Sequence, residues 1–303
     1  MLSWINHRMQ VLDEIMRHDG LREYTSPPVC SHCLDDPGVH RCLDCSAISS
    51  YCATCITSRH KELPLHRIEV CQSVHNFFFS LMSAQVWSDG FYQRTTLLEL
   101  GCSFYIGHQH TPCPSPKSIF KQILVVDTNG VHYINVQFCA CTKHPDWVKN
   151  YRQLLRIKWY PASFCRPKTV FTFDLLDTYH KVMLQGKLGL LDFYIAIMQK
   201  SDNCGRRKAV VSNQHLSLAI PDLASSQERY HEISRCVRQW RHLKLIKRGG
   251  GGHSPSNLTC VPAGAFALEC PACPHPGRNL PADWDKAPDG MKYALPCVRI
   301  HPS

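Results

Sequence analysis

Apolar residues recur along this chain at intervals that predict several of its helices. Near the N-terminus the interval is three or four positions, which indicates an amphipathic helix over residues 2–18 that ends before Gly20. The same interval returns in residues 175–183, 188–198 and 227–247. Most of the predicted helix therefore lies in the second half of the chain. The first helix carries its apolar stripe at Leu2, Ile5, Met9, Leu12 and Met16.

A different pattern, rich in β-branched and aromatic residues, occupies residues 119–126 and 131–138. The four residues between these runs, 127–130, end in an Asn-Gly pair, which favours a tight hairpin turn. The sequence therefore predicts a β-hairpin here. The apolar and aromatic residues 70–101 show no such pattern, and we expect them to form helix and loop packed as core.

Length and composition describe a globular protein with room for two or three compact units: 303 residues, of which 44% are hydrophobic. There is no run of eighteen uncharged apolar residues, and the first residues lack the basic and apolar regions of a signal peptide. We therefore expect a nuclear protein, with the cytoplasm as the alternative and no membrane partner. In either compartment the 18 cysteines favour metal ligation over disulfides.

Eight candidate metal ligands lie within residues 30–66. Tetrahedral zinc takes four Cys or His ligands, and each Cys-x2-Cys knuckle supplies two. Two structural zinc ions are therefore predicted, in a unit so small that chelation should unfold it. Three knuckles come first and two histidines close the series: Cys30 and Cys33, Cys42 and Cys45, Cys52 and Cys55, then His60 and His66.

Two connectivities fit this spacing. Sequential pairing would place neighbouring knuckles on one metal, whereas a cross-brace interleaves them. We favour the cross-brace, because a Cys-x2-Cys followed by two spaced histidines resembles the end of a B-box zinc domain. A shell closed by four protein ligands leaves no position for a catalytic water. The cross-brace would place Cys30, Cys33, Cys52 and Cys55 on the first zinc, and Cys42, Cys45, His60 and His66 on the second.

A third metal site is predicted beside the hairpin. Cys139 and Cys141 follow its second strand two residues apart, so both side chains point to the same face of an extended chain. His108 and Cys113, from a loop rich in Gly and Pro, could complete the shell. His110 is a rival ligand, and the alternative is a surface histidine beside a buried Cys-x-Cys without metal.

Positive charge is concentrated late in the chain. The net charge is +10, and residues 206–248 hold ten Lys or Arg against three acids. Such an asymmetry points to a polyanionic partner such as DNA. We expect the basic side chains of the helix over residues 227–247 to contact phosphates, and a solvated helix face is the alternative. The candidates are Arg229, Arg235, Arg238, Arg241, Lys244, Lys247 and Arg248.

Two further groups complete the candidate chemistry. Cys270 and Cys273 form another knuckle, which we interpret as half of a metal site because no nearby ligand has a diagnostic spacing. A nuclease site would have to use Asp174, Asp177 and Asp192. These acids lie near predicted helix starts or among apolar residues, where the helix dipole accounts for acidic side chains without catalysis.

Several short motifs follow one another between residues 100 and 295. They include Gly107-His108, Phe138-Cys139-Ala140-Cys141, Trp159-Tyr160-Pro161-Ala162, Phe171-Thr172-Phe173-Asp174 and Trp240-Arg241-His242-Leu243. In this order they resemble the CxC-like cysteine-cluster region associated with KDZ (Kyakuja-Dileera-Zisupton) transposases. Relative to that pattern, residues 71–86 and 208–226 resemble insertions, and the chain ends where the catalytic domain of the transposases would begin.

The expected organisation combines the periodic elements with this resemblance. It comprises a helix over 1–20, a B-box-like two-zinc module over 28–70, an apolar connector over 71–100, a CxC-like cysteine-cluster domain over 101–205, a loop over 206–226, and a basic helix with the last knuckle over 227–303. We thus expect an α+β fold: a small cross-brace zinc module, a β-hairpin-containing cysteine-cluster unit, and a mainly α-helical region.

The resemblance and the zinc ligands together predict a function. We expect a zinc-binding module derived from a KDZ transposase, without enzymatic activity, that binds DNA such as transposon ends, or protein, in transposition. Two zinc ions are expected, with a third at the Cys-x-Cys. The alternative is a B-box-like protein-interaction scaffold that does not bind nucleic acid.

Overall fold

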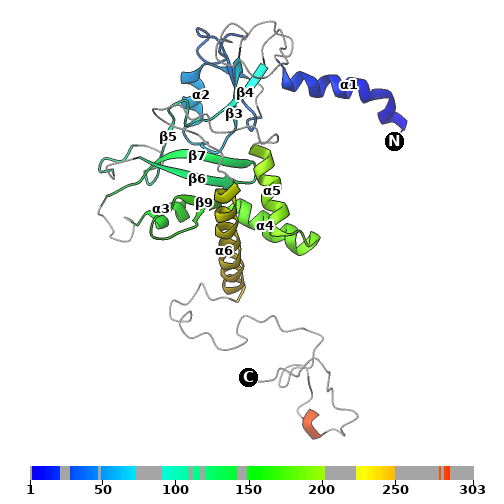
Figure 1. Cartoon of the computed structure of the whole chain (residues 1–303), viewed down its shortest axis with the longest axis vertical. Coiled ribbons are helices and arrows are strands. Elements are labelled where there is room, and N and C mark those ends of the chain that lie inside the picture. The colour runs from blue at the N-terminus through cyan, green and yellow to red at the C-terminus, as the bar shows by residue number, and fades with distance from the viewer. Residues whose placement is uncertain are drawn as a thin grey trace. The chain divides into compact units, whose positions relative to one another are not determined.

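A computed structural model describes residues 2–20, 28–46, 49–72, 91–108, 112–116, 120–141, 149–201, 223–249, 280 and 283–286 (Figure 1). These residues contain six α-helices and two sheets of four and five strands, which confirms the α+β prediction. The chain divides into two units, residues 1–240 and 241–303, and the second holds a short 3-10 helix, Trp284–Lys286. No helix in the described ranges is long and apolar enough to cross a membrane.

The first sheet belongs to the region of the predicted zinc module, and its strand order is β2-β1-β3-β4, antiparallel throughout. Helix α1 (Leu2–Asp19) precedes the sheet, as predicted, and α2 (Ala53–Arg59) follows β2. Its small core contains Tyr51, Ile56 and Ile68 together with several of the predicted cysteine ligands. The strands are β1 (His40–Cys42), β2 (Ser50–Tyr51), β3 (Ile68–Gln72) and β4 (Phe91–Thr95).

Strand β4 corrects the prediction of helix and loop for residues 70–101. It pairs with β3 over five residues, from Ile68 opposite Thr95 to Gln72 opposite Phe91. Its aromatic residues suit a strand as well as a core helix, and its partner lies about twenty residues upstream, so the sequence pattern alone did not distinguish the two. Residues 73–90 of the predicted connector lie outside the described residues.

The second sheet has the strand order β5-β7-β6-β9-β8. Its centre is the predicted hairpin of β6 and β7, with Asp127 opposite Gly130 across the turn. The pairs β5–β7 and β6–β9 are parallel, whereas β6–β7 and β8–β9 are antiparallel. The strands are β5 (Ser103–Tyr105), β6 (Lys121–Asp127), β7 (Gly130–Gln137), β8 (Trp159–Pro161) and β9 (Thr169–Thr172).

Both faces of this sheet are covered, which explains the continuous apolar run in β6. Ile123 and Val125 face one core, and Leu124 and Val126 face the other, because successive side chains of a strand point to opposite faces. Helix α3 (Asn150–Arg156) contributes Leu154 to the first core. Helices α4 (Phe173–Gly186) and α5 (Leu190–Ser201) pack in the second core, beside β6 and β7 (Figure 1).

Helix α6 (Leu223–Arg248) begins four residues earlier than predicted, inside the expected loop. Its residues Ile233, Cys236 and Val237 are buried in the same core as α4 and α5. The first half of α6 is therefore part of the cysteine-cluster fold, whereas the sequence placed the whole helix in a separate C-terminal segment. The predicted domain boundary at residue 227 was wrong. The many basic residues of the helix suggested a solvent-exposed segment and hid the few apolar residues that pack in the core.

Candidate metal centres

The structure gathers Cys30, Cys33, Cys52 and Cys55 into one cluster, which we call site 1. The four sulfur atoms lie within 4.8 Å of one another, and those of Cys33 and Cys52 are 3.9 Å apart. A tetrahedral ion with Zn–S bonds of about 2.3 Å places its sulfurs about 3.8 Å apart. The cluster, in which Cys30 is fully buried, therefore fits a structural zinc ion with four thiolate ligands.

Site 2 combines two thiols and two imidazoles, those of Cys42, Cys45, His60 and His66. Cys42 Sγ lies 3.3 Å from His66 Nδ1, and Cys45 Sγ lies 3.4 Å from both His66 Nδ1 and His60 Nε2. The ligands of sites 1 and 2 alternate along the chain, so the arrangement is the interleaved one and not sequential pairing.

His60 presents a defined nitrogen to site 2. Its Nδ1 lies 2.8 Å from the carbonyl oxygen of Ile56, so Nδ1 carries the proton and Nε2 keeps its lone pair towards Cys45. The side chain is 1% exposed, and burial is the main cause that lowers its pKa. A neutral imidazole is the form that ligates a metal.

An ion pair holds the loop between Cys42 and Cys45. The carboxylate of Asp44 accepts hydrogen bonds from the backbone N of Arg67 at 2.6 Å and from its Nη2 at 2.8 Å. Burial opposes ionisation of Asp44, but the hydrogen bonds from Arg67 outweigh burial and lower the pKa of that carboxyl. Because Arg67 directly follows His66, this contact ties the second knuckle to the histidine loop.

Helix α2 connects the two sites. Cys52 is its N-cap residue, Cys55 lies in its first turn, and His60 is its C-cap residue. The partial positive charge at a helix N-terminus stabilises thiolates, and site 1 lies at that end. One seven-residue helix thus positions ligands of both sites.

The thiols of site 1 differ in pKa, so they do not ionise equally readily. Burial raises the pKa of Cys30, but backbone hydrogen bonds from Cys33, Cys52 and His32 outweigh burial and lower that pKa to about 6. The hydrogen bond with Cys52, followed by burial, raises the pKa of Cys55 to about 12. Without a cation the cluster therefore favours one thiolate at the expense of another, whereas a divalent cation would stabilise all four together.

Site 3 lies at the end of β7, where the sequence predicted that Cys139 and Cys141 bind a metal ion. Its ligand set is His108, Cys113, Cys139 and Cys141. His108 Nε2 lies 3.1 Å from Cys139 Sγ and 3.4 Å from Cys141 Sγ, and Cys113 Sγ lies 3.5 Å from both sulfurs. These separations suit a Cys3His zinc site.

Two residues outside the ligand set shape site 3. The side chain of Gln153, 3% exposed, accepts a hydrogen bond from Cys139 N at 2.9 Å and donates one to Cys139 O at 2.8 Å. Gly107 has φ +110°, and a Cβ at this position would lie 2.9 Å from Cys139 Cβ. No sequence pattern marked Gln153, whereas Gly107 stood in the Gly-His motif without a stated role.

The segment that contains site 3 is similar to a known protein family. Residues 97–205 match the family model of the CxC2-like cysteine cluster associated with KDZ transposases. We refer to residues 97–205 as the CxC2 segment, and to the five-stranded sheet within it as the CxC2 sheet. Over these residues the match confirms the resemblance drawn from the motifs, whereas the motif at residues 240–243 lies outside it. The match includes all four ligands of site 3 but none of sites 1 and 2. No curated protein and no solved structure matches the chain.

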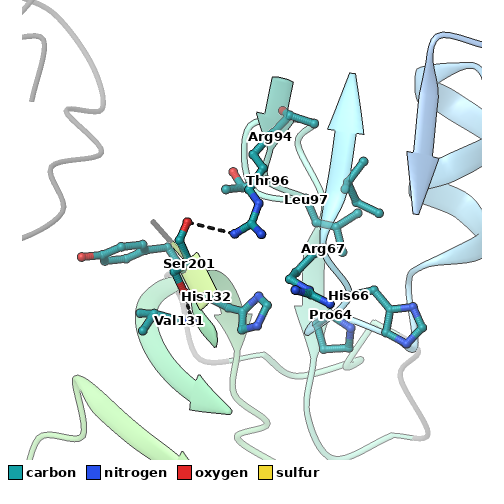
Figure 2. Close-up of a pocket in the computed structure, with 12 residues that line it drawn as sticks. Pro64, His66, Arg67, Arg94, Thr96, Leu97, Val131, His132 and Ser201 are labelled. Atoms are coloured by element: carbon teal, nitrogen blue, oxygen red, sulfur yellow. Dashed lines mark hydrogen bonds between the residues drawn. The ribbon is translucent and has the colours of Figure 1, made fainter. Parts of the chain in front are cut away.

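The CxC2 segment contacts the zinc module at the hairpin turn. Asn129 Nδ2 donates to the carbonyl oxygen of Leu65 at 2.8 Å, and His132 Nε2 lies 2.7 Å from Asn129 Oδ1, where it must be the donor. Arg94 of β4 donates to the carbonyl oxygen of Ser201 at the end of α5, at 2.9 Å (Figure 2). Both regions line a cavity of about 50 Å³. The loop that carries the histidines of site 2 and the β6–β7 hairpin therefore meet through specific hydrogen bonds.

The basic residues proposed to contact phosphate differ in exposure. Arg238, Lys247 and Arg248 are exposed. Arg235 is also exposed, but its Nη2 donates to the carbonyl oxygen of Ala162 at 2.7 Å and so anchors α6. Three others are half-buried: Arg229, Arg241 and Lys244.

Two of the three candidate acidic residues have structural partners, and the third, Asp192, lies in the first turn of α5. Asp174 lies in the first turn of α4, and its Oδ2 lies 3.4 Å from Thr128 Oγ1. Asp177 pairs with Lys181 at 3.0 Å. Within the described ranges, sites 1 to 3 are the groups of three or more His, Cys, Asp or Glu that converge as metal ligands do. Three candidate ligands lie outside these ranges: His110, Cys270 and Cys273.

Proposed function

We propose that this chain is a non-catalytic, zinc-stabilised module that binds DNA in the nucleus, in the context of KDZ-type transposition. Helix α6 carries the proposal. Its residues Ile233 and Val237 are buried beside the CxC2 sheet, while Arg238, Lys247 and Arg248 of the same helix are exposed. A helix fixed by its apolar residues, with cationic side chains in solvent, suits contact with phosphates.

In this proposal the metal ions are structural. Each of the three sets has four protein ligands, and four ligands complete the tetrahedral shell of zinc. Zinc would hold the loops that carry the ligands, and the contacts to DNA would come from side chains elsewhere. Elemental analysis of the purified chain should give three zinc ions per molecule, or more if Cys270 and Cys273 complete a further site.

DNA binding is tested by fluorescence anisotropy with a labelled duplex at several salt concentrations. For each phosphate contact, the slope of log K against log salt is about −0.9 on B-DNA. Replacing Arg238, Lys247 and Arg248 by glutamine should therefore weaken binding and make the slope shallower by about 0.9 for each contact that is lost.

A matched control removes the same charge elsewhere. Lys121, Arg166 and Lys181 are exposed residues outside α6, and their triple replacement by glutamine should leave the slope close to that of the original protein. Equal effects of the two triple variants would show that net charge and not α6 attracts the DNA. A protein that does not bind duplex DNA even at low salt would contradict the proposal and favour the scaffold function.

A further inference from the structure

Helix α1 exposes an unusual amount of apolar surface. Seven of its large apolar side chains are between 43% and 61% exposed: Trp4, Ile5, Met9, Val11, Leu12, Ile15 and Met16. Exposed apolar patches of this kind mark interaction sites, and most of the stability of a helix in a protein comes from the packing of its apolar face. We therefore expect a binding partner to cover the exposed apolar side chains of α1.

The spacing of these residues indicates that the partner is a second helix packed along α1. Together with Leu2, four of them follow the alternating three- and four-residue interval of a coiled-coil seam, in which Leu2, Met9 and Met16 take position a and Ile5 and Leu12 take position d. All five of these positions are apolar. The rival stripe at positions 4, 8, 11 and 15 is interrupted by Arg8, so it makes a poorer seam.

Charge then distinguishes the orientation of the two helices. In this register Arg8 takes position g and Asp13 takes position e. In a parallel pair, position g of one helix faces position e of the other five residues further on, which is the separation of Arg8 and Asp13. Antiparallel pairing places g beside g and e beside e, so these two residues would not meet. Both are exposed, and neither forms an ion pair with another described residue.

We propose that α1 is the interface of a parallel dimer, with a second copy of the chain as its occupant. The two-fold axis pairs the same seam on both copies and forms two equivalent ion pairs between Arg8 of one copy and Asp13 of the other. Arg41 Nη1 donates to the carbonyl oxygen of Gly20 at 3.3 Å, so the end of α1 is connected to the zinc module. This inference does not depend on DNA binding.

The oligomeric state of the full chain tests the seam. Sedimentation velocity over a wide range of concentration should show a monomer that converts to a dimer, because a seam of under three heptads gives a dissociable pair. Leu12→Ser removes a seam residue, whereas Val11→Ser removes a neighbour of nearly equal exposure, 43% against 46%, from outside the seam. Leu12→Ser should raise the dissociation constant at least tenfold, and Val11→Ser should change it little.

Charge exchange tests the orientation. Asp13→Arg places like charges opposite each other in the parallel dimer and should weaken it, and adding Arg8→Asp should restore the original dissociation constant. Helix content by circular dichroism verifies that each variant is folded. A protein that stays monomeric at all concentrations, equal effects of Leu12→Ser and Val11→Ser, or failure of the charge exchange to restore dimerisation would overturn the proposal. The first result would indicate that another surface covers α1.

Discussion

Gly107 shows how one residue can decide whether site 3 forms. It immediately precedes the ligand His108, and its φ of +110° is one that other residues rarely adopt. A Cβ here would also lie 2.9 Å from the Cβ of Cys139, so the ligand itself would have to move. The Gly-His motif of the sequence thus has two physical causes, a backbone conformation and a close approach.

We predict that Gly107→Ala weakens zinc binding at site 3 by about tenfold to a hundredfold, the range seen when residues that orient ligands are lost. Gly101→Ala is the matched control, because Gly101 also has positive φ, +76°, but a Cβ there has nothing within 4 Å. Both variants place a Cβ on a residue with positive φ, so both carry backbone strain. Competition with a chromophoric chelator measures the affinity for the third metal ion, and equal losses in both variants would assign the effect to strain alone.

At the scale of elements, the β6–β7 hairpin makes a contact with the zinc module that its sequence pattern did not indicate. The Asn-Gly pair predicted the turn, and the turn is there, but the pattern could not show that the side chain of Asn129 donates to Leu65 in the zinc module. His132 orients that amide by donating from Nε2 to its oxygen. Burial lowers the pKa of His132 to about 4, so the ring stays neutral when the protein is folded.

This hydrogen-bonded pair predicts a pH dependence. Between pH 6.5 and pH 4 the unfolded chain binds a proton at His132 and the folded chain does not, so stability falls as the pH falls through this window, by at most about 3 kcal/mol. With zinc in excess, the free energy of unfolding in urea should fall less steeply with pH in His132→Phe than in the original protein. The exposed His242→Gln is the control. Parallel pH profiles for all three proteins would contradict the prediction.

Elements differed in how far the sequence could predict them. The helices over 173–186 and 190–201 were predictable because their apolar residues face one core at helical spacing. Strands β8 and β9 were missed, since they are short and all their residues are buried, so no alternation marks them. The cysteine ligands were predictable because the two cysteines of a Cys-x2-Cys knuckle stand at a fixed, recognisable spacing in the sequence. Gln153 was not predictable, because only the folding of the chain brings it next to Cys139.

At the scale of the whole molecule, we expect the two sheets to depend on metal to different degrees. The core beside sites 1 and 2 comprises eleven residues, of which five are cysteine ligands, and its other members include Ile56 and Ile68. The CxC2 sheet has two apolar cores, one on each face, and neither contains a ligand of site 3. Bound zinc would therefore supplement a small hydrophobic core in the first sheet and would only fix a loop in the second.

Removing zinc should separate these two behaviours. Hydrogen exchange measured by mass spectrometry after addition of EDTA should show that the amides around Ile56 and Ile68 lose protection. Those of Val125, Phe171 and Leu175 should keep it, because their side chains are fully buried in apolar cores that contain no candidate metal ligand of site 3. EDTA already saturated with zinc is the control. Loss of protection in both sheets at once would mean that site 3 supports the whole CxC2 core, and protection retained in both would mean that the zinc module folds without metal.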